Sequence, residues 1–285
     1  MNVLVCHGFY PVDTEHFGPD RISIEFFFLL SGFLFYHWLP MIQEMKVASA
    51  IREVFVAKFR PLLVPTVIGM ACNAVLNIMS DYTPKIEVFR YLWYIPAMLI
   101  TLIVYTFLCK GIRNEKVFWC VTASLFVIAT LLRFSGNEAL FFFDYIRSTS
   151  SISLGLLLAK IPQPKKLPMW SRWLLLAPVA VAIFLILYYQ RAVYYVEYEA
   201  LLDLVLYPLL IYITFSIDFH FVPFDFLGAI SFGIYAYQCP ARLVAFLGVP
   251  SRWIPFLLII ALTLIDYFVR LLIRRYQANK TKNAN

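Results

Sequence analysis

The sequence predicts an all-α protein that crosses a membrane several times, and its composition and the spacing of its apolar residues lead to that prediction. Of the 285 residues, 62% are hydrophobic and only 14% are charged, and the mean hydropathy is +0.76. Such a composition is typical of polytopic membrane proteins and excludes an ordinary soluble domain. The apolar residues gather in stretches of about 18 to 22, the length that a helix needs to cross a bilayer.

We predict about nine membrane helices in a single domain that comprises residues 1–285. Turn-forming residues such as glycine, proline and asparagine separate these helices. A polar tail, residues 273–285, follows the last of them. The predicted windows are residues 22–40, 61–80, 88–109, 117–134, 139–160, 173–190, 200–217, 226–247 and 253–272.

Lysine and arginine are distributed unequally between the two sides that alternating helices define. One side carries 16 of these 24 residues and the other carries 6, with Arg133 among the six, while Arg147 and Arg242 fall inside windows. The positive-inside rule therefore predicts an inner (cytoplasmic) membrane protein whose C-terminus is cytoplasmic. This asymmetry accounts for the net charge of +7 without a nucleic-acid partner.

The first residues do not fit this topology as they stand. Nine helices and a cytoplasmic C-terminus place residue 1 on the outer side, and the short apolar run MNVLVCHGF cannot span a bilayer. We therefore expect this run to be the end of a truncated first helix, so that the intact protein has ten helices.

The window at residues 22–40 contains polar groups that a plain membrane anchor does not need. Its sequence ISIEFFFLLSGFLFYHWL has the length to cross a hydrocarbon core of roughly 30 Å as one helix. Glu25 falls in the predicted first turn, where the helix dipole favours an anion. The pair Ser31-Gly32 is more typical of a small-residue helix contact than of a functional site.

Other ionisable residues inside the windows form short-range patterns. Asp144 and Arg147 are three residues apart and Asp266 and Arg270 are four apart, so each pair shares a helix face and can neutralise itself. Arg242 has no acidic residue within one turn, and we expect it to pair across the bundle or to extend towards the membrane surface.

Residues 23–36, SIEFFFLLSGFLFY, resemble the FFxxSGF signature of the membrane-bound acyltransferase 3 family, many members of which O-acetylate bacterial surface glycans. His7 falls where the first-helix histidine of this family is expected. Weaker matches follow in the family's order: Lys58-Phe59-Arg60 with Pro65, Leu92-Trp93-Tyr94, Arg147 with Gly155, and residues 231–240.

The chain departs from the family pattern in three places. An arginine expected about ten residues before His7 would precede Met1. The basic pair before the third helix is reduced to Lys58 and Arg60, and Gln238 stands where a histidine is frequent.

The resemblance implies an acyltransferase domain that moves an acyl group, usually acetyl from acetyl-CoA, to a hydroxyl of a cell-envelope or exported polysaccharide or lipid-linked glycan. A hydroxyl is a poor nucleophile at neutral pH, so a base must take its proton as it attacks the thioester. We predict that His7 is this base, that Glu25 orients its imidazole and that Ser31 donates a hydrogen bond.

The same resemblance implies where acyl-CoA, the donor substrate, would bind. Lys58 and Arg60 on the predicted cytoplasmic side would hold its phosphates, and Trp93 would line the same cavity. Arg147 is the predicted cation for the substrate or the oxyanion. We predict no bound cofactor and no metal, because the five cysteines stand singly without a CxxC pair.

Two alternatives remain open at this point. A transporter or flippase for a glycan or lipid could line a polar cavity with Asp144, Arg147 and Arg242. The chain could instead be an inactive fragment. Consumption of a thioester separates an enzyme from a transporter.

Overall fold

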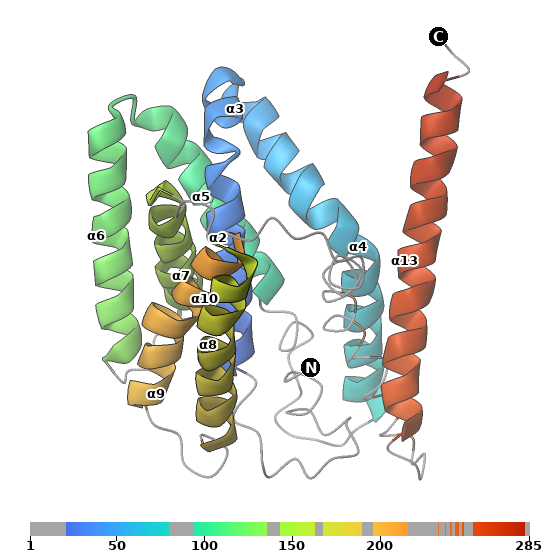
Figure 1. The fold of residues 1–285 in the computed structure, drawn as a ribbon. Coiled ribbons are helices and arrows are strands. Elements are labelled where there is room, and N and C mark those ends of the chain that lie inside the picture. Colours follow the sequence, from blue (N-terminus) through green and yellow to red (C-terminus); the bar gives the residue numbers. More distant parts are fainter. Residues whose placement is uncertain are drawn as a thin grey trace.

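The computed structural model of the 285-residue chain consists of helices throughout the part that it describes (Figure 1). No strand occurs in this part, which confirms the predicted all-α fold. The described residues are 21–79, 94–135, 143–162, 168–189, 196–215 and 253–282, with the single residues 233, 237, 240, 243, 244 and 247. The predicted first-helix remnant and most of the window 226–247 lie outside these residues.

The helices include several membrane spans. By length and composition, four described helices are able to cross a membrane: Tyr94–Gly111, Glu115–Phe134, Glu197–Phe215 and Trp253–Ile273. They correspond to α5 (Tyr94–Gly111), α6 (Glu115–Phe134), the α9–η2–α10 segment and the first two thirds of α13 (Trp253–Lys282). The protein is therefore a multi-pass membrane protein. The predicted polar tail is helical as far as Lys282, because α13 continues beyond its apolar part.

The window at residues 22–40 is not one helix. It divides into α2 (Arg21–Tyr36) and α3 (Leu39–Glu44), and the N–H groups of His37 and Trp38 bond to carbonyls only three residues back, at 3.3 and 2.9 Å. Pro40 lies in the first turn of α3 and has no N–H with which to continue α2. The prediction of one membrane-crossing helix is therefore wrong, since 16 residues extend only about 24 Å.

The predicted basic loop before residue 61 is also helical. Helix α4 runs from Val47 to Met79, fourteen residues earlier than the window, and bends by 65° between Val47–Ala57 and Leu62–Cys72. Figure 1 shows the two halves at different angles. Pro61 and Pro65 account for the bend, because each removes an intrahelical hydrogen bond.

Helix α7 (Phe143–Lys160) lies at the centre of the bundle, packed against α2, α5 and α6. Its crossing with α2 depends on two glycines. A Cβ atom on Gly32 would lie 2.1 Å from the carbonyl oxygen of Ile152, and one on Gly155 would lie 2.1 Å from that of Leu29. This backbone contact confirms that Ser31-Gly32 belongs to a small-residue helix interface.

The remaining helices cover the far side of α2. They are α8 (Met169–Tyr189), α9 (Val196–Leu201), the π-helix η2 (Leu202–Leu206) and α10 (Tyr207–Phe215). Their apolar residues pack with Leu29 and Phe33 of α2 and Leu158 of α7.

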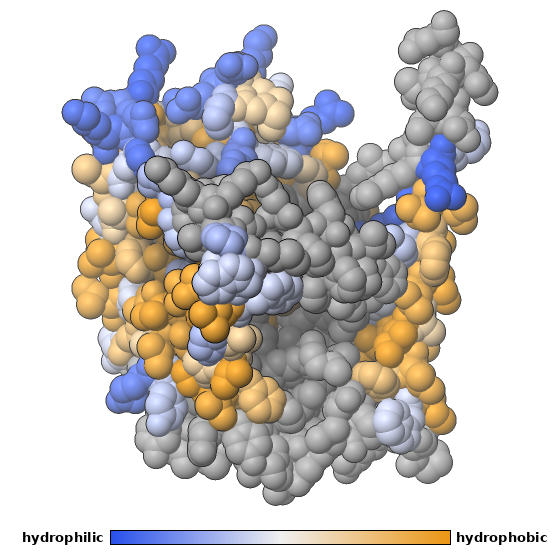
Figure 2. Space-filling view, in the orientation of Figure 1, coloured by the Kyte–Doolittle hydropathy of each residue, from blue (hydrophilic) through white to orange (hydrophobic). Residues whose placement is uncertain are grey.

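One end of the bundle is basic. Figure 1 places α3, the turn between α5 and α6 and the C-terminal end of α13 at this end, and Figure 2 shows a hydrophilic surface there above orange flanks. Lys46, Arg52, Arg113, Lys116 and Lys160 are exposed. These residues all belong to the predicted basic side, so the predicted grouping agrees with the structure; the compartment that this end faces stays a prediction.

Candidate buried polar site

Glu25 is the centre of a buried ion-pair network between α2 and α7. Its residue exposure is 1%, although it carries a carboxylate within an apolar helix. Arg147 donates from Nε to Oε1 at 2.6 Å and contacts the same oxygen through Nη2, while Ser151 donates to Oε2 at 3.0 Å. Arg147 and Ser151 lie four residues apart on α7 and so share the face that meets α2.

This arrangement corrects two expectations. Glu25 is the fifth residue of α2, which has no acidic residue in its first turn, so its neighbours rather than the helix dipole hold its charge. Asp144 is a peripheral partner of Arg147, because its side chain is 45% exposed and its Oδ1 lies 4.0 Å from Nη1. The main partner of Arg147 is Glu25, on another helix.

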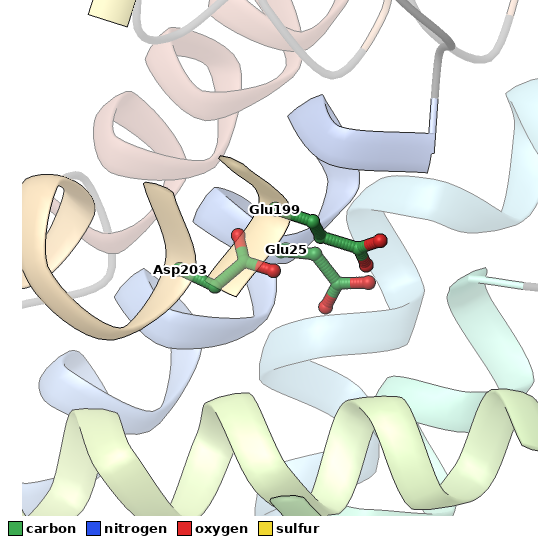
Figure 3. Close-up of side chains that lie close together, drawn as sticks. All are labelled: Glu25, Glu199 and Asp203. Atoms are coloured by element: carbon green, nitrogen blue, oxygen red, sulfur yellow. The ribbon is translucent and has the colours of Figure 1, made fainter. Parts of the chain in front are cut away.

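A second guanidinium enters the network from the last turn of α6. Arg133 Nη2 lies 3.4 Å from Glu25 Oε1 and also pairs with Glu199 Oε1 of α9 and Asp203 Oδ2 of η2. Figure 3 shows the carboxylates of Glu25, Glu199 and Asp203 close together, Glu25 on α2 and the other two about one turn apart on the continuous α9–η2 segment. Arg133, which the charge count placed on a membrane surface, is only 4% exposed.

The local geometry of η2 belongs to this arrangement. The N–H of Tyr207 bonds to the carbonyl of Leu202, five residues back, which is the π-helical pattern. π-helical turns are rare and occur frequently at functional sites. Here the turn carries Asp203, whose carboxylate meets Arg133.

The oxygen atoms of the three carboxylates could also act as ligands of a hard metal cation. Their nearest oxygen atoms lie within 4.8 Å of one another, and oxygen ligands are those that Mg²⁺ and Ca²⁺ prefer. One guanidinium nitrogen, Arg133 Nη2, forms an ion pair with all three. The network therefore already brings a positive charge to the point where these oxygens converge.

Hydroxyl groups line the other faces of α7. Thr101 pairs with Ser148 at 2.7 Å, Tyr105 with Ser153 at 2.5 Å, and Thr130 with Ser150 at 2.7 Å. Each bond joins α7 to α5 or α6, and interhelical hydroxyl pairs of this kind fix helices inside a membrane. The helix that carries Arg147 is thus held on several sides.

The structure brings together only some of the predicted site residues. Glu25 and Arg147 are in direct contact. Ser31 Oγ instead donates to Met98 Sδ of α5 at 3.3 Å, and six residues of helix rotate it by about 240° from Glu25. Ser31 therefore faces α5, whereas Glu25 faces α7 and α6.

For the residues predicted to bind acyl-CoA, the structure describes at most the backbone. Lys58 and Arg60 belong to α4, at its bend, and their side chains lie outside the described part of the structure. His7, Trp93 and Arg242 also lie outside it.

The predicted pair on the last helix is confirmed. Arg270 Nε donates to Asp266 Oδ1 at 3.0 Å within α13.

Sequence analysis did not identify Arg133, Glu199, Asp203 and Ser151 as members of the site. A signal exists for two of them, because these acids are four residues apart, with Glu199 just before the apolar window 200–217 and Asp203 inside it. Their partner Arg133 is 66 and 70 residues away in the chain, a separation for which no spacing rule holds.

The chain matches a known protein family along most of its length. A family model described as an acyltransferase domain, that of acyltransferase 3, matches residues 1–269. No curated protein and no solved structure is significantly similar to the chain. The match includes every element of the buried network and nearly the whole chain, so this multi-pass membrane protein belongs to the acyltransferase 3 family and is an acyltransferase of groups other than aminoacyl groups.

Proposed function

We propose that the protein transfers an acyl group, acetyl from acetyl-CoA, to a hydroxyl of a cell-envelope or exported glycan. The observation that carries this proposal is the buried pair of Glu25, six residues before Ser31 of the SGF motif on α2, and Arg147 of α7. Ionisable groups at membrane depth cost about 2.5 to 3.5 kcal/mol each on insertion scales, so they are retained chiefly where they serve a function.

In the proposed reaction His7 takes the proton of the acceptor hydroxyl as the hydroxyl oxygen attacks the thioester carbon. The tetrahedral intermediate then breaks its C–S bond, and the imidazolium returns the proton to the departing CoA sulfur. Glu25 would orient the imidazole and stabilise its charged form, in the way that a carboxylate serves other catalytic histidines. Arg147, which Glu25 holds at the start of α7, is the proposed cation for the oxyanion.

The basic end of the bundle is suited to bind an anionic acyl donor such as acetyl-CoA. Exposed Lys46, just before α4, and exposed Arg52 on α4 precede Lys58 and Arg60 in the chain, and the phosphates of CoA suit lysine and arginine side chains. Because CoA is a cytosolic compound, we infer that this end and the C-terminus face the cytoplasm, and that the acceptor arrives from the other side of the inner membrane. Neutralising Lys58 and Arg60 should raise the KM for acetyl-CoA about tenfold with little change in kcat.

The direct test uses the full chain purified into nanodiscs. Acetyl-CoA and cell-envelope polysaccharide are added, CoA release is followed with a thiol reagent, and acetylated sugar is detected by mass spectrometry. We expect the parent protein to release CoA only when the polysaccharide is present, and His7→Ala to abolish that release. Asp266→Asn on α13 is the matched control, because it changes an acidic residue outside the buried network.

The opposite result is equally clear. If no thioester is consumed while labelled glycan crosses a sealed vesicle that contains the protein, the transporter alternative replaces this proposal. If neither occurs, the inactive alternative holds for this chain.

A further inference from the structure

We propose that Arg133, Glu199 and Asp203 are positioning residues for the acyl transfer, which act by fixing the carboxylate of Glu25. The inference rests on the proposed function, in which Glu25 orients the catalytic imidazole. None of the three residues belongs to the FFxxSGF signature or to the predicted donor site.

The contacts of Glu25 divide between its two oxygens. Oε1 receives the Nε and Nη2 groups of Arg147 and lies 3.4 Å from Arg133 Nη2, while Oε2 receives the hydroxyl of Ser151. Two guanidinium groups from different helices therefore hold Oε1. With Oε1 held in this way, the direction of Oε2 is fixed.

Arg133 is held in turn by α9 and η2. Its Nη2 group pairs with Glu199 and Asp203, and these contacts are shorter than its 3.4 Å contact with Glu25. The two acids therefore draw Arg133 partly away from Glu25. Arg147 remains the closer cation of Glu25, and Arg133 acts as a second, weaker contact.

The contact between Arg133 and Asp203 leaves one buried polar atom of each side chain without a protein partner in the part of the chain that the structure describes. Among the described residues, Arg133 Nε and Asp203 Oδ1 have no hydrogen-bond partner, although the residues are each 4% exposed. A parallel two-bond contact between the same two side chains would satisfy both atoms. Buried polar atoms without partners are costly and rare. Here the cost accompanies an arrangement in which Arg133 Nη2 contacts Glu25 as well as Glu199 and Asp203.

The inference gives a specific kinetic expectation. Asp203→Asn keeps the shape of the side chain but removes its charge, so Arg133 should move towards Glu25 and compete with Arg147. We expect kcat to fall between tenfold and a hundredfold, the range that a misplaced catalytic group produces. The KM for acetyl-CoA should stay within about twofold, because the network is separate from the basic end of the bundle.

A variant in which Arg133, Glu199 and Asp203 are all replaced by neutral residues distinguishes an effect on the position of Glu25 from an effect on folding. The combined variant Arg133→Gln, Glu199→Gln and Asp203→Asn removes one cation and two anions and leaves the pair of Glu25 and Arg147 balanced. Replacing buried ion networks in full is much less destabilising than removing one partner. We expect a melting temperature close to that of the parent but a kcat as low as that of Asp203→Asn. A parental kcat in the combined variant would overturn the inference.

A spectroscopic measurement decides the inference without activity. The carboxylate stretching band of Glu25 is assigned in the full chain in nanodiscs by the infrared difference from Glu25→Gln. The band should shift in Asp203→Asn and in the combined variant but not in Asp266→Asn. An unmoved band in Asp203→Asn contradicts the inference, even where the combined variant fails to fold. If the parent consumes no thioester yet the band shifts, the proposed function fails while the positioning of Glu25 stands.

Discussion

The protein contains two kinds of ion pair within apolar helices, and they differ in how they are built. On α13, Asp266 and Arg270 lie one turn apart on the same helix, with side chains 14% and 31% exposed. In the bundle, Glu25 and Arg147 are 122 residues apart in the chain and at most 3% exposed. The first pair neutralises itself wherever α13 lies, whereas the second exists only if α2 and α7 pack correctly. A residue that needs the whole bundle to neutralise it is costly to keep, and this makes the second pair the candidate for chemistry.

Among changes to these two ion pairs, the largest effect should come from Glu25→Gln. The change leaves Arg147 and Arg133 with one carboxylate fewer and removes the group that orients the proposed base. We expect kcat to fall about 10² to 10⁴-fold, measured as CoA release from acetyl-CoA, with a lower melting temperature. Glu25→Asp should recover part of the activity, and a fully active Glu25→Gln would remove the functional distinction between the two pairs.

Gly155→Ala should disrupt the same region through packing alone. A methyl group there would lie 2.1 Å from the carbonyl oxygen of Leu29, so α2 and α7 must separate. We expect a loss of about 1 to 3 kcal/mol in stability, the usual cost of overpacking, together with lost activity. Gly111→Ala is the control, because a Cβ there meets nothing within 4 Å. Equal melting temperatures for both variants would contradict the close helix crossing.

Arg147→Lys tests geometry rather than charge. Lysine keeps the positive charge but cannot present the two nitrogens that meet Glu25 Oε1. We expect about a tenfold fall in kcat, equivalent to about 1.4 kcal/mol, with a smaller change in melting temperature than in Arg147→Met. Steady-state kinetics would measure the fall in kcat, and thermal unfolding would measure the change in melting temperature. Full activity of Arg147→Lys would mean that a positive charge at this position is sufficient.

Asp266→Asn should give the smallest effect. The pair lies within one helix, in the last two turns of the membrane span Trp253–Ile273, so Arg270 can extend towards the membrane surface when Asp266 loses its charge. We expect CoA release to stay within twofold of the parent and the melting temperature to change by a degree or two. A large loss of activity would show that α13 takes part in the site and would end the contrast between the two pairs.

Much of the secondary structure follows from the sequence, and its errors are local. Helices α5, α6 and α7 lie within a few residues of their predicted windows, because long apolar stretches determine membrane helices. Two of these errors occur at prolines. Pro40 divides the first window, and Pro61 bends α4 without ending it. Proline removes one hydrogen bond in either case, and the surrounding packing decides whether the helix stops or bends.

By itself the sequence determined the helical class, the basic side, the self-contained pair of Asp266 and Arg270, and the polar character of Glu25 and Arg147. These features depend on composition or on neighbours within one turn, where helix geometry is fixed. Only the tertiary structure decided that the main partner of Arg147 is Glu25 and not Asp144. It also decided that Arg133 pairs with Glu199 and Asp203 and so links them to Glu25. The physical reason is that the partner of a buried charge is chosen by which helices pack together, and here that choice depends on two glycines that let α2 and α7 touch.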